Sequence, residues 1–233
     1  MLPVDVAPPP KLEGWLNSAT MSIPITQFSG TARWVRRWPF LAAAAAAVGV
    51  AACQDQVQPG EPGAKLHDPL YPEFQLTDTE GQTFDFATES KGSVTLLFFG
   101  YTRCPDVCPV HMANIAGALK KLPHRIASQV QVVFVTTDPD RDTPKRIREW
   151  LDQFDQKFIG LTGTGEEIAA AGRRVKIAPA VKEPQENGDY LMSHSARVIA
   201  FTADGVGRYL YPFGTRQADW ATEIPTLVSW QAE

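Results

Sequence analysis

The strongest constraint on the fold comes from two apolar runs, SVTLLFFG at residues 93–100 and VQVVFVTT at residues 130–137. A strand that is apolar at nearly every position is buried on both faces, as in the centre of a sheet that helices cover on both sides. Apolar residues at helical spacing follow each run, from Met112 to Leu122 and from Ile147 to Phe154. Two strand-and-helix units of this kind predict an α/β fold around a central sheet.

The flanking segments complete the predicted sheet. FQLTDTEGQTFDF, residues 74–86, and ARVIAFTADGVGRYLY, residues 196–211, carry strand-forming residues on both sides of a glycine turn, which predicts two hairpins. Thr164 and Glu167 have capping-box spacing, and a last helix is expected around Trp220. The predicted fold is a mixed sheet flanked by helices, with an N-terminal hairpin.

The N-terminal part predicts export. Three arginines precede WPFLAAAAAAVGVAAC, residues 38–53, an apolar run of signal-peptide length that ends in small residues. The run is short for a membrane span, which needs roughly 20 apolar residues, so a cleaved signal is favoured over an uncleaved membrane anchor. Its end, VAAC, resembles the lipobox of bacterial lipoproteins, in which the cysteine, here Cys53, becomes the lipidated first residue.

Three parts follow from this division of the chain. Residues 1–52 are expected to be an N-terminal extension and export signal of the lipoprotein type, and residues 71–233 the folded domain. Residues 53–70 are polar and rich in Pro and Gly, so they predict a flexible tether. The formal charge of −4 argues against nucleic acid as a partner, because phosphate-binding surfaces carry a basic excess. An exported location permits disulfide chemistry.

Two strand ends converge on one candidate site. Cys104 and Cys108 follow the first apolar run in YTRCPDVCPVHM, and TTDPDRDTP, residues 136–144, overlaps the end of the second. The carboxyl ends of central strands in such sheets lie at the edge where ligands bind. Pro109 suits the first turn of a helix, and a helix N-terminus beside Cys108 is expected to lower the pKa of its thiol.

The cysteine pair admits three interpretations. Three residues separate Cys104 from Cys108, a spacing that can bring the Cα atoms within the roughly 7 Å of a disulfide, or present two sulfurs to one metal ion. Dithiol oxidoreductases usually have two intervening residues, which weakens a purely redox function. Two buried core thiols without chemistry are the third possibility.

A third ligand would distinguish a metal site from a redox pair. Of the four histidines, His67, His111 and His124 are expected at surface or packing positions, whereas His194 precedes an apolar strand that could neighbour the cysteine strand. Two thiolates and one imidazole suit copper, because thiolate favours Cu(I) and imidazole tolerates Cu(II). Zinc is the chemical alternative, but structural zinc prefers four protein ligands. Met192 could add a thioether, although packing is its expected role.

The acidic loop after the second run matches the spacing of a calcium-binding loop at Asp138, Asp140, Asp142 and Glu149. Its sixth position is Thr143, where a calcium loop needs glycine, and a helix is expected from Pro144. We therefore expect these carboxylates to cap the helix and to form a negative rim that orients the site or a partner.

Three motifs, GYTRCPDVCP, TTDPDRDTP and MSHS before a strand, together resemble the Sco/SenC family of copper proteins over about residues 70–230. The resemblance implies a thioredoxin-like domain that binds one copper ion through Cys104, Cys108 and His194. It also implies a role in assembling the dinuclear copper centre of cytochrome c oxidase. Three aspartates belong to the same motifs and are expected to support the site: Asp106, Asp138 and Asp142.

Location and partners follow from the same resemblance. The protein is expected on the periplasmic or outer face of the cytoplasmic membrane, where Cys53 would carry a lipid, whereas many family members use a transmembrane helix. The expected partners are the copper-bearing oxidase subunit and another periplasmic copper chaperone or thiol reductase. Family resemblance leaves copper delivery and thiol reduction both open. A thiol–disulfide oxidoreductase with a redox-active pair at Cys104 and Cys108, and an interaction module with a structural disulfide, are the alternatives.

Overall fold

The computed structural model describes residues 63–230. The expected export signal, Cys53 and the first part of the expected tether lie outside the described residues. The described elements are β1 (Ala64–Leu70), β2 (Gln75–Asp78), β3 (Thr83–Asp85), α1 (Phe86–Glu89), β4 (Val94–Gly100), α2 (Val107–Lys121), α3 (His124–Ala127), β5 (Val130–Thr136), α4 (Pro144–Leu151), β6 (Ile159–Thr162), α5 (Gly165–Arg174), β7 (Val181–Pro184), β8 (Tyr190–Ser193), β9 (Val198–Phe201), β10 (Gly207–Tyr211) and α6 (Gln217–Ser229).

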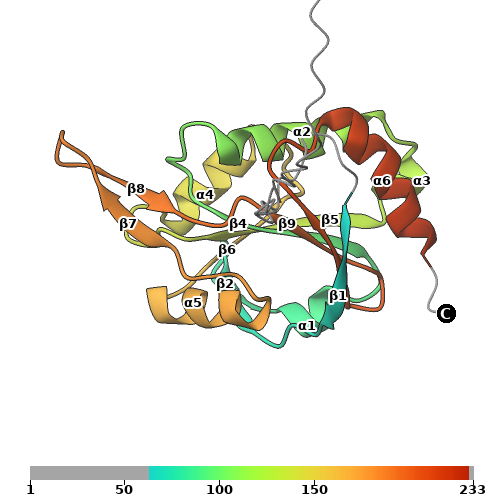
Figure 1. The fold of residues 1–233 in the computed structure, drawn as a ribbon, viewed down its shortest axis with the longest axis horizontal. Coiled ribbons are helices and arrows are strands. Elements are labelled where there is room, and N and C mark those ends of the chain that lie inside the picture. Colours follow the sequence, from blue (N-terminus) through green and yellow to red (C-terminus); the bar gives the residue numbers. More distant parts are fainter. Residues whose placement is uncertain (1–62, 231–233) are drawn as a thin grey trace, which may run out of the picture. The chain divides into compact units, whose positions relative to one another are not determined.

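An eight-stranded mixed sheet in the order β1-β10-β9-β4-β5-β6-β2-β3 forms the centre of the described domain. Strands β4, β5 and β6 are parallel, whereas the strands on either side of this group pair antiparallel with their neighbours. Helices α2, α3, α4 and α6 lie on one side of the sheet, and α1 and α5 lie on the other (Figure 1). The predicted mixed sheet between helices and both predicted hairpins are confirmed.

Alternation along the central strands divides the core into two layers. Phe98 and Phe134 pack against α2, α4 and α6, while Leu97, Phe99 and Val133 pack against α1 and α5. Every residue of β4 is buried. Because successive side chains of a strand point to opposite faces, burial on both faces requires a sequence that is apolar at nearly every position, and Thr95 is the polar residue of this strand.

Two helices begin at the residues that the sequence predicts. Thr143 caps α4 by accepting a hydrogen bond from the Arg146 amide, and Pro144 occupies the first turn. Thr164 and Glu167 form the predicted capping box of α5. These side chains satisfy amides that a helix leaves free at its start. Within residues 63–230, none of the helices combines the length and apolarity required to cross a bilayer.

Strand β1 corrects the expectation that residues 53–70 form a flexible tether. Residues 64–70 pair antiparallel with β10, for example Ala64 with Leu210. Most of the strand is exposed, but Leu70 is buried at 4% exposure in the layer that includes α1 and α5. An edge strand is held mainly by backbone hydrogen bonds, so it needs no apolar pattern, and Pro69 is tolerated in it.

The polar segment after residue 180 forms a second sheet that the sequence did not predict. Strands β7 and β8 pair antiparallel around a loop at residues 185–189, in which Gly188 has φ 81°. This hairpin extends away from the main sheet (Figure 1). Asn187 and Gly188 are a recognised turn signal, which could have identified it. The hairpin matters for the site because β8 ends one residue before His194.

Candidate metal centre

Three side chains from separate parts of the chain meet at one edge of the main sheet. Cys104 lies after β4, Cys108 lies in the first turn of α2, and His194 lies between β8 and β9. Their ligand atoms, one from each side chain, all lie within 4.8 Å of one another. Strand β9 is antiparallel to β4, so the start of β9 lies beside the end of β4. The structure therefore brings together the three residues that the sequence singled out.

The Cys104 sulfur lies among hydrogen-bond donors at the start of α2. The Cys108 amide donates to it across 3.4 Å. A hydrogen bond from the Cys108 thiol is the largest of the effects that lower the pKa of Cys104 to about 4; burial opposes them, and the His194 ring and the amides of Cys108 and Asp106 add to them. Stabilisation by several donors favours the charged form, so Cys104 is a thiolate at neutral pH.

Cys108 behaves in the opposite way. Its side chain is fully buried, and burial, reinforced by the neighbouring Cys104 sulfur, raises the pKa of the Cys108 thiol. The sequence predicted a lowered pKa for this residue because it starts a helix. That prediction is wrong, since desolvation of a buried thiolate outweighs the effect of the helix N-terminus. The pair therefore consists of one thiolate and one thiol that retains its proton.

The ring of His194 is oriented by its own loop. Its Nδ1 donates a hydrogen bond to the Ser195 carbonyl at 2.9 Å, and its Nε2 lies 3.5 Å from the Cys108 sulfur. Because a carbonyl can only accept, Nδ1 carries a proton, and Nε2 is the ring nitrogen that faces the sulfurs. The edges of Phe98 and Tyr101 pack against the ring at centroid distances of 6.0 and 5.5 Å. Metal-binding imidazoles are commonly held by such a bond from the second nitrogen.

Asp142 fixes the segment that precedes Cys104. Its buried carboxylate accepts hydrogen bonds from the Thr102 amide at 2.9 Å, the Thr102 hydroxyl at 2.5 Å and the Thr136 hydroxyl at 2.8 Å. These bonds join the ends of β4 and β5. Asp142 is 1% exposed, so it does not contribute to the negative rim that the sequence predicted.

Asp138 connects the same loop to the β7–β8 hairpin. Its buried carboxylate accepts from the Arg141 guanidinium at 2.5 Å and from the Tyr190 hydroxyl at 2.8 Å. The Arg141 guanidinium also lies 3.5 Å from the centre of the Tyr190 ring. On the surface, Asp140 pairs with Lys182 at 2.6 Å. The carboxylates of Asp138 and Asp140 thus both pair with side chains of the protein.

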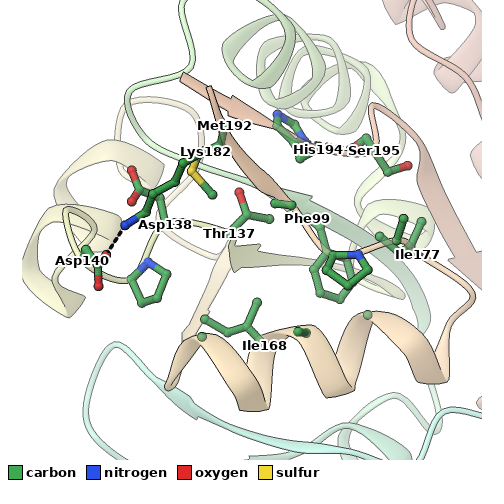
Figure 2. A pocket seen from close by; sticks show the side chains of 17 residues that line it. Phe99, Thr137, Asp138, Asp140, Ile168, Ile177, Lys182, Met192, His194 and Ser195 are labelled. Atoms are coloured by element: carbon green, nitrogen blue, oxygen red, sulfur yellow. Dashed lines mark hydrogen bonds and ion pairs between the residues drawn. The ribbon is translucent and has the colours of Figure 1, made fainter. Parts of the chain in front are cut away.

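The other residues that the sequence proposed for the site do not belong to the cluster of Cys104, Cys108 and His194. Asp106 caps α2 by accepting from the Val107 amide. Met192 is buried and, with His194, lines a pocket of about 280 Å³ between α5 and the loops after β5 and β8 (Figure 2). The lining of this pocket includes neither cysteine, so the pocket adjoins the cluster rather than enclosing it. His67 and His124 are exposed, as the sequence predicts.

His111 is the residue whose importance the sequence did not reveal. It is 1% exposed, and its Nε2 donates to the Ala196 carbonyl at 2.9 Å, within the loop that carries His194. Burial lowers the pKa of its imidazole, which is therefore neutral near pH 7. Its position three residues after Cys108 was the available signal, because that spacing places both side chains on one face of a helix.

Comparison with known proteins identifies close relatives of the described domain. The family profile described as SCO1/SenC matches residues 63–229. A SCO2-like protein of Rickettsia felis is 37% identical over 145 residues, which cover 60% of this chain and 67% of that protein. The mitochondrial SCO1 homolog 1 of Arabidopsis thaliana is 39% identical over 104 residues, 45% of this chain and 31% of that protein. This chain therefore spans only part of the length of the relatives it matches.

A solved structure shows the same fold. ScoI of Bradyrhizobium japonicum, solved with copper bound, is 34% identical and superposes with a TM-score of 0.58, covering 72% of this chain and 100% of that one. The mixed sheet with helices on both faces is thus thioredoxin-like, as the motifs implied.

Proposed function

The chain belongs to the SCO1/SenC family, and from this premise we propose that it binds one copper ion through Cys104, Cys108 and His194. The observation that carries the proposal is the convergence of two sulfurs and an imidazole nitrogen within 4.8 Å. The proposed role is the assembly of the dinuclear copper centre of cytochrome c oxidase, with the copper-bearing subunit of that enzyme as the partner. Copper is then cargo that the protein receives and passes on.

The donor set fits copper better than zinc. Sulfur ligands favour Cu(I), and imidazole nitrogen makes Cu(II) acceptable. Within residues 63–230 the cluster consists of three side chains of the Cys, His, Asp or Glu type, whereas a structural zinc site uses four. Since Cys104 is already a thiolate, Cys108 is the cysteine that must lose a proton when a metal binds.

The exposure of the ligands indicates how a partner could take the metal. Cys108 is completely buried, Cys104 is 9% exposed, and His194 is partly exposed. Ligands of a partner protein would therefore reach a bound ion from the side of Cys104 and His194. Cys108 would hold the ion longest, because no partner group can approach it without first displacing the outer ligands.

The proposed location is the outer face of the cytoplasmic membrane. Its support is the sequence of residues 38–53, with an apolar signal that ends in VAAC. A lipid on Cys53 would keep the folded domain at the surface of the membrane that contains the oxidase. Exchange of metal or electrons with another periplasmic copper chaperone or thiol reductase belongs to the same proposal.

Metal analysis of the copper-loaded, reduced protein tests the main proposal. We expect one copper ion per chain that resists a moderate chelator, together with a sulfur-to-copper absorption band in the Cu(II) form. The matched control is His67→Ala, which removes an exposed imidazole of strand β1 and should leave the copper content unchanged. A reduced, folded protein that retains no copper would refute the proposal.

Thiol–disulfide exchange is the second candidate, favoured by the opposite pKa shifts of the two cysteines. The Cys104 thiolate would attack a partner disulfide and release one partner thiolate. Cys108, after losing its proton, would then attack the Cys104 sulfur and release the second. The partner disulfide is thereby reduced to two thiols, and Cys104 and Cys108 become a disulfide.

The variant His194→Ala separates the two functions. It removes the imidazole ligand but leaves both sulfurs in place. Loss of tight copper binding with continued disulfide exchange would show that the same cysteines can perform both reactions. Unchanged copper affinity in this variant would exclude His194 as a ligand.

A further inference from the structure

We propose that His111 is a positioning residue that holds the loop carrying His194 against the two cysteine sulfurs. The proposal rests on the copper site proposed above, although its first test needs no metal. His111 belongs to the same helix as Cys108, one turn later. A single rigid helix would thus carry one sulfur and hold the segment that supplies the imidazole.

The hydrogen bonds of the loop support this role. Residues 194–197 join β8 to β9 without regular secondary structure. His194 bonds to the carbonyl of its neighbour Ser195, and the Arg197 amide bonds to the Ser195 hydroxyl, so both bonds stay within the loop. Apart from the contacts of His194 with the two cysteines, the bond from His111 to Ala196 is the side-chain hydrogen bond in the described domain that connects this loop to another element.

Aromatic packing makes the connection rigid. The Phe98 ring lies 5.0 Å from the His111 ring and 6.0 Å from the His194 ring, measured between centroids. Phe98 is fully buried in strand β4, and the centroid of the Phe213 ring lies 5.7 Å from that of His111. Both imidazoles therefore rest on the same immobile side chain, and His111 has little freedom to follow a moving loop.

Loss of this hydrogen bond should loosen His194 without removing any ligand. Ala196 is partly buried and lies two residues from His194, so its carbonyl, once it loses the donor, gains from moving towards water. Residues that orient a metal ligand typically change metal affinity by about 10- to 100-fold when they are altered. We expect a change of that size when the donor at position 111 is removed.

Two variants of nearly equal side-chain length isolate the donor. In His111→Gln the amide nitrogen can occupy the place of Nε2 and donate to Ala196, whereas the thioether of His111→Met cannot donate. Asn114→Ala is the control from the same helix, because it removes a 3.2 Å bond to the Thr215 carbonyl in a different loop.

The first measurement is amide hydrogen exchange of residues 195–197 in the metal-free, reduced protein. We expect His111→Met to raise exchange there by about tenfold, and His111→Gln and Asn114→Ala to stay within about threefold of the unaltered protein. The second measurement is copper affinity, in which His111→Met should be weaker by about 10- to 100-fold and His111→Gln close to normal. Unchanged exchange in His111→Met, or equal effects of Met and Gln, would overturn the proposal.

Nuclear magnetic resonance of the unaltered protein provides a test that does not depend on the folding of a variant. We expect the His111 Nε2 to carry a slowly exchanging proton with a scalar coupling to the Ala196 carbonyl carbon. A proton on Nδ1 instead, or no coupling, would contradict the hydrogen bond itself. If the unaltered protein bound no copper, the proposed function would fail, while these metal-free measurements would still decide whether His111 positions the loop.

Discussion

At the scale of single residues, the two cysteines differ in what they contribute to the site. Cys104 is stabilised as a thiolate by donors at the start of α2, while Cys108 keeps its proton because it is fully buried. The pair thus combines a nucleophilic sulfur with a buried sulfur, and His194 lies beside both. This arrangement suits either metal binding or disulfide exchange. Which sulfur carries the charge decides which of them reacts first with an added reagent.

We expect Cys104→Ser and Cys108→Ser each to abolish tight Cu(I) binding. A hydroxyl is a poor ligand for Cu(I), and one thiolate with one imidazole is an incomplete set. Competition against a Cu(I) chelator measures the affinity, and circular dichroism checks that the fold survives. Stoichiometric copper retained by either folded variant in the presence of the chelator would remove that cysteine from the ligand set.

The rate of alkylation by iodoacetamide should reveal the lowered pKa of Cys104. A thiolate with a pKa of about 4 reacts at an almost constant rate from pH 8 to about pH 5.5 and at half that rate near pH 4. An ordinary thiol, with a pKa near 8.5, would instead lose about tenfold in rate for each pH unit below 8. Mass spectrometry of the labelled peptide assigns the reacting cysteine.

The variant Cys108→Ala is the control for this experiment. It removes the thiol hydrogen bond that contributes most to the low pKa of Cys104. The pH at which alkylation slows should therefore rise. A pH profile identical to that of the unaltered protein would show that the Cys108 thiol is not the cause.

At the scale of secondary-structure elements, the acidic loop between β5 and α4 organises the edge of the sheet. Asp142 reaches across to Thr102 after β4, and Asp138 reaches Tyr190 at the start of β8. Strand β8 leads into His194, and the segment after β4 leads into Cys104. This loop thus determines where both arms of the site lie, which explains why the carboxylates of Asp138 and Asp142 are buried.

We expect Asp142→Ala to destabilise the fold by about 3 kcal/mol, because three buried donors lose their acceptor. The matched control is Asp140→Ala in the same loop, which loses only a surface ion pair with Lys182 and should cost less than about 1 kcal/mol. Urea unfolding of both variants, followed by circular dichroism, measures the difference. Equal stability of the two variants would contradict the structural role of Asp142.

At the scale of the whole molecule, the domain begins earlier than the composition of the sequence indicates. Strand β1 lies within residues that read as a linker, yet it extends the main sheet beyond β10. A chain that begins at residue 63 should therefore be more stable than one that begins at residue 71, by about 2–3 kcal/mol for the burial of Leu70 alone. Urea unfolding of the two chains checks this, and equal midpoints would mean that β1 adds nothing to stability.

The proposed attachment to the membrane depends on the sequence that precedes the described domain. If the signal ends at Ala52, Cys53 carries a diacylglyceryl thioether and an N-acyl chain, which exceed the single chain that binds a bilayer only marginally. We expect Cys53→Ala to block lipidation without changing copper binding. Mass spectrometry of the native N-terminus is decisive, because an intact peptide from Arg37 to Gln54 would show an uncleaved anchor.

Sequence alone determined the central sheet, the starts of α4 and α5 and the identity of the three clustered side chains. These features are local: burial on both faces requires apolar strands such as β4, capping requires Thr143 or Thr164, and sulfur and imidazole chemistry belongs to the residue type. Tertiary structure decided the features that depend on contacts between residues far apart in the sequence. The charge on Cys104 rather than Cys108, the strand formed by residues 64–70 and the bond from His111 to Ala196 all arise from contacts between distant segments. Burial and hydrogen-bond partners of this kind are absent from any single stretch of sequence, and they set both the pKa values and the position of the loop that carries His194.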